Sequence, residues 1–248
     1  MVYRRTILLL ILYLTLVVYS FGQKANIGFK IGTLFSDNYG TDAVSKAKFK
    51  PGITGGVFLC HHLSGNIYLQ YGLNYENKGY QIKLEGIQVL KTFGVLTGTY
   101  RTRFNHNYIT FPVIAKYHFS KGKTNYIGFG SYCSILINAI QDGVSNYPES
   151  SSFPTSLCDG MDSCYDPYGF IRPVKDGDYY YLVERDITGL LKKGDFGFSI
   201  ELGSLKQIND NLMLLYNAQF SFGLVNIDKK YDRSIRNNSF TLTIGFGF

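Results

Sequence analysis

The chain has 248 residues, of which 45% are hydrophobic, 16% aromatic and 17% charged, and its formal net charge is +7. This apolar and aromatic content excludes an intrinsically disordered chain, and the length suits one all-β domain. It also excludes a protein with several membrane-spanning helices, because each helix needs about 20 consecutive apolar residues and only the N-terminal segment comes near that. The basic residues are scattered, so we expect no nucleic-acid partner.

Residues 1–22 have the features of a secretory signal peptide. A pair of arginines precedes a short apolar run, and the small residues Ser20 and Gly22 follow it. This arrangement is typical of exported proteins. We therefore expect export, cleavage near Gly22 and a single mature domain that covers residues 23–248.

Between the signal segment and residue 223, seven stretches alternate apolar and polar residues with a period of two, as β-strands with one apolar face do. Connections after the first, third, fifth and seventh stretch are long, and the others are short. Such an alternation of long and short connections is expected of a membrane barrel with an even number of strands. The longest connection, residues 138–193, is expected to be an irregular external loop. The seven stretches cover residues 25–32, 49–60, 67–78, 108–119, 126–137, 196–203 and 212–223.

Two features within this series carry separate expectations. Residues 79–102 are rich in Gly and Thr and could extend the strands on either side. Pro112 lacks a backbone donor, so it predicts a bulge or another local irregularity in its strand.

The eighth stretch, residues 239–248, has the clearest pattern, with an apolar residue at every even position from 240 to 248. Taken alone, it fits the last strand of a soluble sheet as well as a strand in lipid. The aromatic ending resembles that of bacterial outer-membrane barrels, in which the assembly machinery reads the C-terminal strand. The resemblance implies that Phe246 and Phe248 form the assembly signal.

The polar faces of these strands are rich in glycine and carry a few charges. A narrow eight-stranded lumen is only just wide enough for side chains and therefore needs small residues. Lys or Arg in contact with lipid at the bilayer midplane costs about 2–4 kcal/mol, and all strand charges here avoid the apolar face. We therefore expect a lumenal charge network that fills the barrel, since buried charges need partners. Its members are Lys30, Glu76, Lys78, Lys116 and Glu201.

The sequence thus predicts an all-β fold, an eight-stranded antiparallel up-and-down transmembrane β-barrel with long external loops. The expected location is the outer membrane of a Gram-negative bacterium. The alternative is a soluble lipocalin-like barrel, whose apolar faces turn inward and carry an apolar ligand.

Four stretches resemble the PorT-like outer-membrane β-barrel family of Bacteroidetes-type bacteria. The most specific is Asn107-Tyr-Ile-Thr-Phe-Pro-Val113, with Tyr and Pro four residues apart. The resemblance covers most of the mature chain and implies the barrel fold and the outer-membrane location. Some relatives belong to protein secretion or gliding machinery. The other three stretches are residues 27–32, 128–132 and 245–248.

The expected function is a structural or binding role through the external loops. Expected partners are outer-membrane lipid, the barrel-assembly machinery and envelope proteins or glycans. The sequence shows no recognisable catalytic, cofactor-binding or metal site, and we expect no enzyme. The alternatives are an envelope component of a secretion or gliding apparatus, a membrane enzyme built at the loop rims, and a small pore.

The four cysteines divide into two kinds. Cys158 and Cys164 are close together in the longest loop of an exported chain, which predicts a disulfide, with two free thiols as the alternative. Cys60 and Cys133 lie within strands and are expected to act as small apolar residues.

Overall fold

A computed structural model describes most of the chain after the predicted signal peptide, which itself lies outside the described residues, as does Cys158. In this part of the chain no helix has the length and apolarity needed to cross a membrane. The described residues are 25–40, 47–91, 94–119, 122, 124–147, 164–166, 169–171, 179–210, 212–229 and 234–248.

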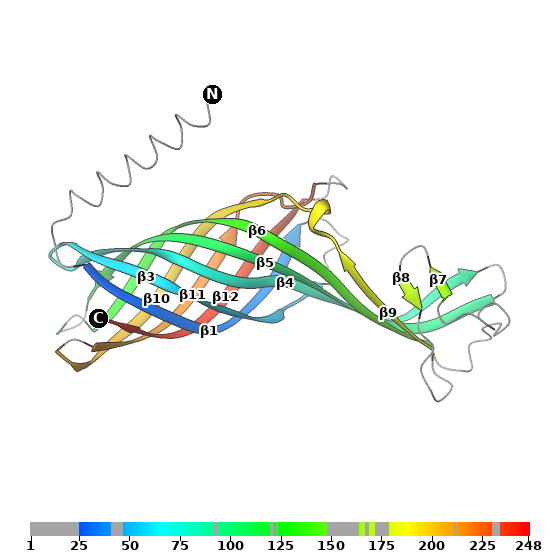
Figure 1. Ribbon diagram of the computed structural model, residues 1–248, viewed down its shortest axis with the longest axis horizontal. Helices are drawn as coiled ribbons and strands as arrows, with labels where there is room; N and C mark the ends of the chain where they lie inside the picture. The colour runs from blue at the N-terminus through cyan, green and yellow to red at the C-terminus, as the bar shows by residue number, and fades with distance from the viewer. Residues whose placement is uncertain are drawn as a thin grey trace, which may run out of the picture.

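Eight antiparallel strands form a closed ring (Figure 1). Strands adjacent in the ring are adjacent in the chain, and the pairing of the first strand with the last closes the barrel. The predicted eight-stranded up-and-down barrel is confirmed. Its strands are β1 (Ala25–Gly40), β3 (Lys50–Ser64), β4 (Ile67–Lys91), β5 (Gly94–His118), β6 (Asn125–Tyr147), β10 (Gly194–Asn209), β11 (Leu212–Gly223) and β12 (Ile235–Gly247).

The two ends of the barrel differ. The short connections β3–β4, β5–β6 and β10–β11 lie at one end together with the start of β1 and Phe248, whose N–H donates to the carbonyl of Ile27 (2.8 Å). We call this the turn end. At the opposite loop end, β4, β5 and β6 continue far beyond the barrel (Figure 1). The extension of β4 to Lys91 and of β5 from Gly94 agrees with the sequence pattern of residues 79–102.

The prediction that residues 138–193 are irregular is wrong for residues 138–147, 164–166, 169–171 and 179–186, which lie in strands, whereas residues 187–193 contain a short 3-10 turn and otherwise irregular chain. The end of β6 pairs with β5 on one side and with β9 (Tyr179–Asp186) on the other. These segments extend beyond the apolar belt, so they lack the apolar alternation that marks the membrane strands. Backbone pairing holds them, together with side-chain contacts such as the hydrogen bond from the Asn105 amide on β5 to Asp142 on β6 (3.1 Å). The remaining short elements are β2 (Ala47–Lys48), β7 (Cys164–Asp166), β8 (Gly169–Ile171) and the 3-10 turn η3 (Thr188–Leu190).

The outer surface of the barrel is apolar and its interior is polar. On β10, exposed Phe198 and Ile200 alternate with buried Ser199 and Glu201. The same arrangement, with apolar residues outside and polar residues inside, recurs around the ring. It forms a continuous apolar belt, which would be unstable in water. This excludes the lipocalin-like alternative, in which the apolar faces point inward. Exposed residues of the belt include Ile31, Ile53, Val57, Phe111, Val113, Phe129, Ile135, Leu202, Leu242 and Ile244.

Pro112 interrupts one ladder without adding a residue. It pairs in register with Tyr132 of β6, while the ladder to β4 has no pair between Tyr71–Val113 and Asn74–Thr110. The irregularity that the sequence predicts is therefore present, but it is not a bulge. The shift in the β5–β6 ladder lies nearer the loop end, between Asn107 and Tyr108.

The apolar belt predicts a cost for charge that depends on depth. Phe129 is 59% exposed and pairs with Ala115 and Ile200 in the middle of the belt, whereas Phe119 is 57% exposed beside a turn. We expect Phe129→Arg to lower the free energy of unfolding by about 2–4 kcal/mol and Phe119→Arg by about 0–1 kcal/mol. Denaturant titration in phospholipid vesicles measures both, and equal losses at the two positions would contradict a lipid-facing belt.

Candidate functional site: a filled lumen with a pocket at each end

A first group of paired side chains crosses the lumen toward the turn end. The Lys116 ammonium of β5 lies 2.6 Å from Oε1 of Glu201 on β10 and 3.9 Å from the ring centroid of Tyr126 on β6. The Tyr126 hydroxyl donates to the same Glu201 oxygen at 2.9 Å. Lys30 of β1 is buried within electrostatic range of Glu201. We call these four residues the turn-end layer.

A second group crosses the lumen toward the loop end. Lys78 lies 2.8 Å from Glu76 Oε2 and 3.9 Å from Asp195 Oδ2, and its ammonium stands 4.5 Å from the ring centroid of Tyr132. The Asn237 amide donates to Asp195 Oδ2 (3.0 Å). These five residues, the loop-end layer, come from β4, β6, β10 and β12, so the layer ties separate sides of the barrel together.

All five charges that the sequence assigned to the lumen are buried there, none more than 6% exposed. Four of them form two ion pairs, Lys116 with Glu201 and Lys78 with Glu76. The sequence analysis missed Asp195 and Asn237, because it began both strands a few residues too late. Asp195 is an even number of residues from Glu201 on one strand, and this spacing places both on the same face.

Glycines on the polar faces make room for the tyrosines of these layers. A Cβ on Gly203 would collide with the ring of Tyr126, and one on Gly197 would collide with the ring of Tyr132. The aromatic rings therefore lie directly over glycine backbone on the next strand. The sequence predicts small residues in a crowded lumen, but it does not show which aromatic ring fills each gap.

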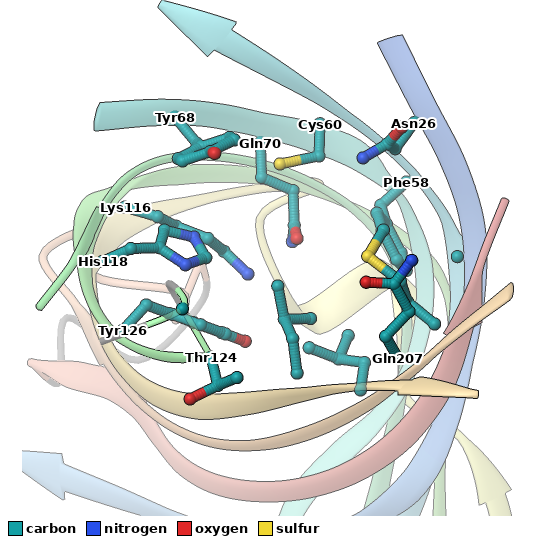
Figure 2. A pocket seen from close by; sticks show the side chains of 15 residues that line it. Asn26, Phe58, Cys60, Tyr68, Gln70, Lys116, His118, Thr124, Tyr126 and Gln207 are labelled. Carbon is teal, nitrogen blue, oxygen red and sulfur yellow. The ribbon is translucent and has the colours of Figure 1, made fainter. Parts of the chain in front are cut away.

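A pocket of about 270 Å³ opens at the turn end, and Lys116 is one of the residues that line it (Figure 2). Figure 2 shows Lys116, Gln70 and Tyr126 pointing into its centre. His118 lies between two aromatic rings, 4.4 Å from that of Tyr68 and 5.2 Å from that of Tyr126. The side chains of Lys116 and Tyr126 belong both to the turn-end layer and to the lining of this pocket.

A second pocket, of about 210 Å³, lies at the loop end. Residues of β1, β4, β5 and β6 form its walls, and η3 and the β11–β12 connection cover it. His106 and Asn38 line it and are 1% and 3% exposed, and neither side chain has a hydrogen-bond partner within the described part of the chain. This pocket was not foreseen, because the sequence analysis assigned its lining to loops or left it without a role.

The remaining predicted residues occupy varied positions. The rings of Phe246 and Phe248 lie 5.5 and 6.2 Å from that of Phe29 on the outer surface. Cys60 lines the turn-end pocket and Cys133 is exposed on the apolar belt; both are free thiols. Cys164 begins β7, and its bond to Cys158 stays a prediction. No group of three or more His, Cys, Asp or Glu side chains that could hold a metal occurs among the residues described.

The loop-end layer predicts a large loss of folding stability when the positive charge of Lys78 is removed. Lys78→Met leaves the carboxylates of Glu76 and Asp195 buried together without a positive partner. Breaking a buried ion pair from one side costs about 3–5 kcal/mol, and we expect a loss of that size in denaturant unfolding in vesicles.

A matched variant separates charge from packing. The triple change Lys78→Met, Glu76→Gln and Asp195→Asn removes all three charges at similar volume, so it should recover most of the lost stability. A triple variant no more stable than Lys78→Met alone would contradict the electrostatic interpretation.

Comparison with known proteins gives one family match. The model of the outer membrane protein beta-barrel domain matches residues 21–229, which is most of the chain. No curated protein matches the sequence.

Solved structures with a similar chain course include two bacterial surface proteins. Neisserial surface protein A (NspA) is 9% identical, with a TM-score of 0.40 over 91% of this chain and 100% of its own. Ail, the attachment invasion locus protein of Yersinia pestis, is 9% identical, with a TM-score of 0.32 over 91% of this chain and 100% of its own. The family match, with the closed ring and its apolar belt, places this chain in the outer membrane of a Gram-negative cell. The chain belongs to the outer membrane protein beta-barrel domain family.

Proposed function

We propose that this barrel is a closed, non-conducting scaffold that binds protein, glycan or other envelope partners at its loop end. In outer-membrane barrels the short turns face the periplasm and the long connections face outward, so the loop end is the external end. The observation that carries the proposal is the pair of charged layers that cross the lumen, Lys116 with Glu201 and Lys78 with Glu76 and Asp195.

The layers argue against a pore on steric and electrostatic grounds. Eight strands enclose a space that side chains can just fill. Here Lys78 is 1% exposed and Glu201 is fully buried, so water has little access to the charges. An open path would require these ion pairs to separate in a low-dielectric interior, where unpaired charges are costly.

The external projection supports a binding role. β4, β5, β6 and β9 are paired well beyond the apolar belt, so they hold a surface away from the membrane on an ordered frame. Recognition residues commonly stand on such connections above a rigid scaffold. Among the described residues, His106 at the loop end has no hydrogen bond to a nucleophile or carboxylate, the arrangement that a general base needs, so the role that we propose here is binding.

Planar-bilayer recording tests the proposal. The purified barrel should give no stepwise current, because both layers block the lumen. A variant with Lys116→Ala, Glu201→Ala, Lys78→Ala, Glu76→Ala and Asp195→Ala should conduct, provided its unboiled form still migrates as a folded barrel on a gel. Stepwise currents from the unaltered protein would overturn the closed-scaffold proposal.

A narrower proposal is that the chain is PorT-like and serves a secretion or gliding apparatus. The Tyr108 and Pro112 motif favours it, since both side chains face the lumen and Tyr108 lies against the loop-end layer, accepting a hydrogen bond from Asn237 (3.3 Å). Purification from cross-linked envelopes should then recover defined secretion or gliding components. Recovery of the barrel alone would count against this role and would leave the closed scaffold unaffected.

A further inference from the structure

The loop-end pocket lies outside the apolar belt. On β5 the outward-facing residues after Ile109, toward the loop end, are Asn107, Asn105 and Arg103. All three are polar or charged. His106 lies at this polar level, with its side chain turned inward. The pocket can therefore exchange its contents with the external aqueous phase rather than with lipid.

The cover of the pocket is held by its own hydrogen bonds. The N–H of Lys192 donates to the carbonyl of Ile227 (2.8 Å), and the N–H of Lys229 donates to the carbonyl of Leu190 (3.1 Å). The η3 segment is also attached to β6, because Ala139 N–H donates to Thr188 Oγ1 (2.8 Å). These hydrogen bonds join η3 and the β11–β12 connection to each other and η3 to β6.

Two buried side chains in this pocket have no partner among the residues that the structure describes. Within that part of the chain, neither ring nitrogen of His106 and neither side-chain amide atom of Asn38 makes a hydrogen bond. Leaving such a group buried and unsatisfied costs about 1–3 kcal/mol. Burial, with a contribution from the charge of Lys50, lowers the pKa of His106 to about 3, so the ring is neutral at pH 7. A neutral imidazole has one donor and one acceptor, and an amide has both as well.

A set of hydroxyl groups can complete these atoms, since each hydroxyl both donates and accepts a hydrogen bond. The rest of the lining suits the apolar faces of a ring. The Tyr80 and Phe104 rings stack with centroids 4.3 Å apart, and Ile187 and Ile227 add aliphatic surface. Arg185 and Asp228 contribute one charge of each sign, so the pocket has no preference for an ion.

The volume agrees with a single ring. A cavity of about 150 Å³ holds a benzene molecule, and this one has about 210 Å³, which leaves room for ring substituents. We propose that the loop-end pocket binds one neutral sugar ring, whose hydroxyls pair with His106 and Asn38. This assignment rests on the proposed external binding function and gives it a ligand class. The ring can belong to a free monosaccharide or to the end of a glycan.

Saturation-transfer NMR on the full barrel in lipid nanodiscs tests the assignment. The probes are the methyl glycosides of glucose, galactose and mannose, with benzoate as a charged ring of similar size. At least one glycoside should receive saturation, and benzoate should not. Failure of all three glycosides, or an equal response from benzoate, would overturn the assignment.

Variants locate the binding. His106→Phe and Asn38→Leu keep the approximate shape and remove the hydrogen-bonding atoms, so each should weaken glycoside binding at least fivefold. Both should leave the unfolding midpoint unchanged or raise it, because they remove unsatisfied buried groups. The matched control is Gln70→Leu in the turn-end pocket, which should bind as the unaltered barrel does. Unchanged affinity in both loop-end variants would overturn the proposal.

A disaccharide separates the two sources of the ring. A glycan end predicts that a disaccharide with the preferred ring at its terminus binds at least as well as the methyl glycoside, whereas a free monosaccharide predicts weaker binding. The bilayer recording is independent of these measurements. A barrel that neither conducts nor binds any glycoside would retain the closed-scaffold function and lose the sugar assignment.

Discussion

Closure of the ring between β1 and β12 is the constraint on which the rest of the structure depends. The two strands pair continuously from Gly28 with Gly247 to Gly40 with Ile235. In hydrocarbon an unpaired backbone group costs several kilocalories per mole, and only a closed barrel leaves no edge. Once the ring is closed, the period of two sends every second side chain into lipid and the others into a narrow lumen.

The lumen then imposes its own requirement, because side chains that enter it lose water and must pair with one another. Two ion pairs meet that need. Lys116 pairs with Glu201 on a strand far away in the sequence, and Lys78 pairs with Glu76, two residues away on the same strand. Glycines such as Gly203 make the space that a tyrosine ring occupies. The interior is therefore the polar core of the protein, and its paired side chains occupy the lumen.

The loop end differs from the membrane-spanning part because the outward row of β5 there is polar, with Asn105 and Arg103 in place of apolar residues. Strands there no longer need an apolar row, so their backbone ladders continue through polar sequence, as at the end of β6 beside β9. These segments and the η3 cover form a pocket beyond the membrane. In it, the side chains of His106 and Asn38 make no hydrogen bond with the described residues. Such groups are costly in a static fold, which is the physical reason to look for a ligand there.

The sequence by itself determined the strand count, the antiparallel order, the lipid-facing residues and the sign of the lumenal charges, because alternation and connection length are local properties of the chain. It did not determine that β6 continues beyond residue 137 or that β9 pairs with it, because those segments lack the apolar alternation. Only the tertiary structure decided that Asp195 joins Lys78, that Asn237 reaches Asp195, and that a pocket forms around His106. Those contacts depend on the register and stagger of strands around the ring, which no single stretch of sequence contains.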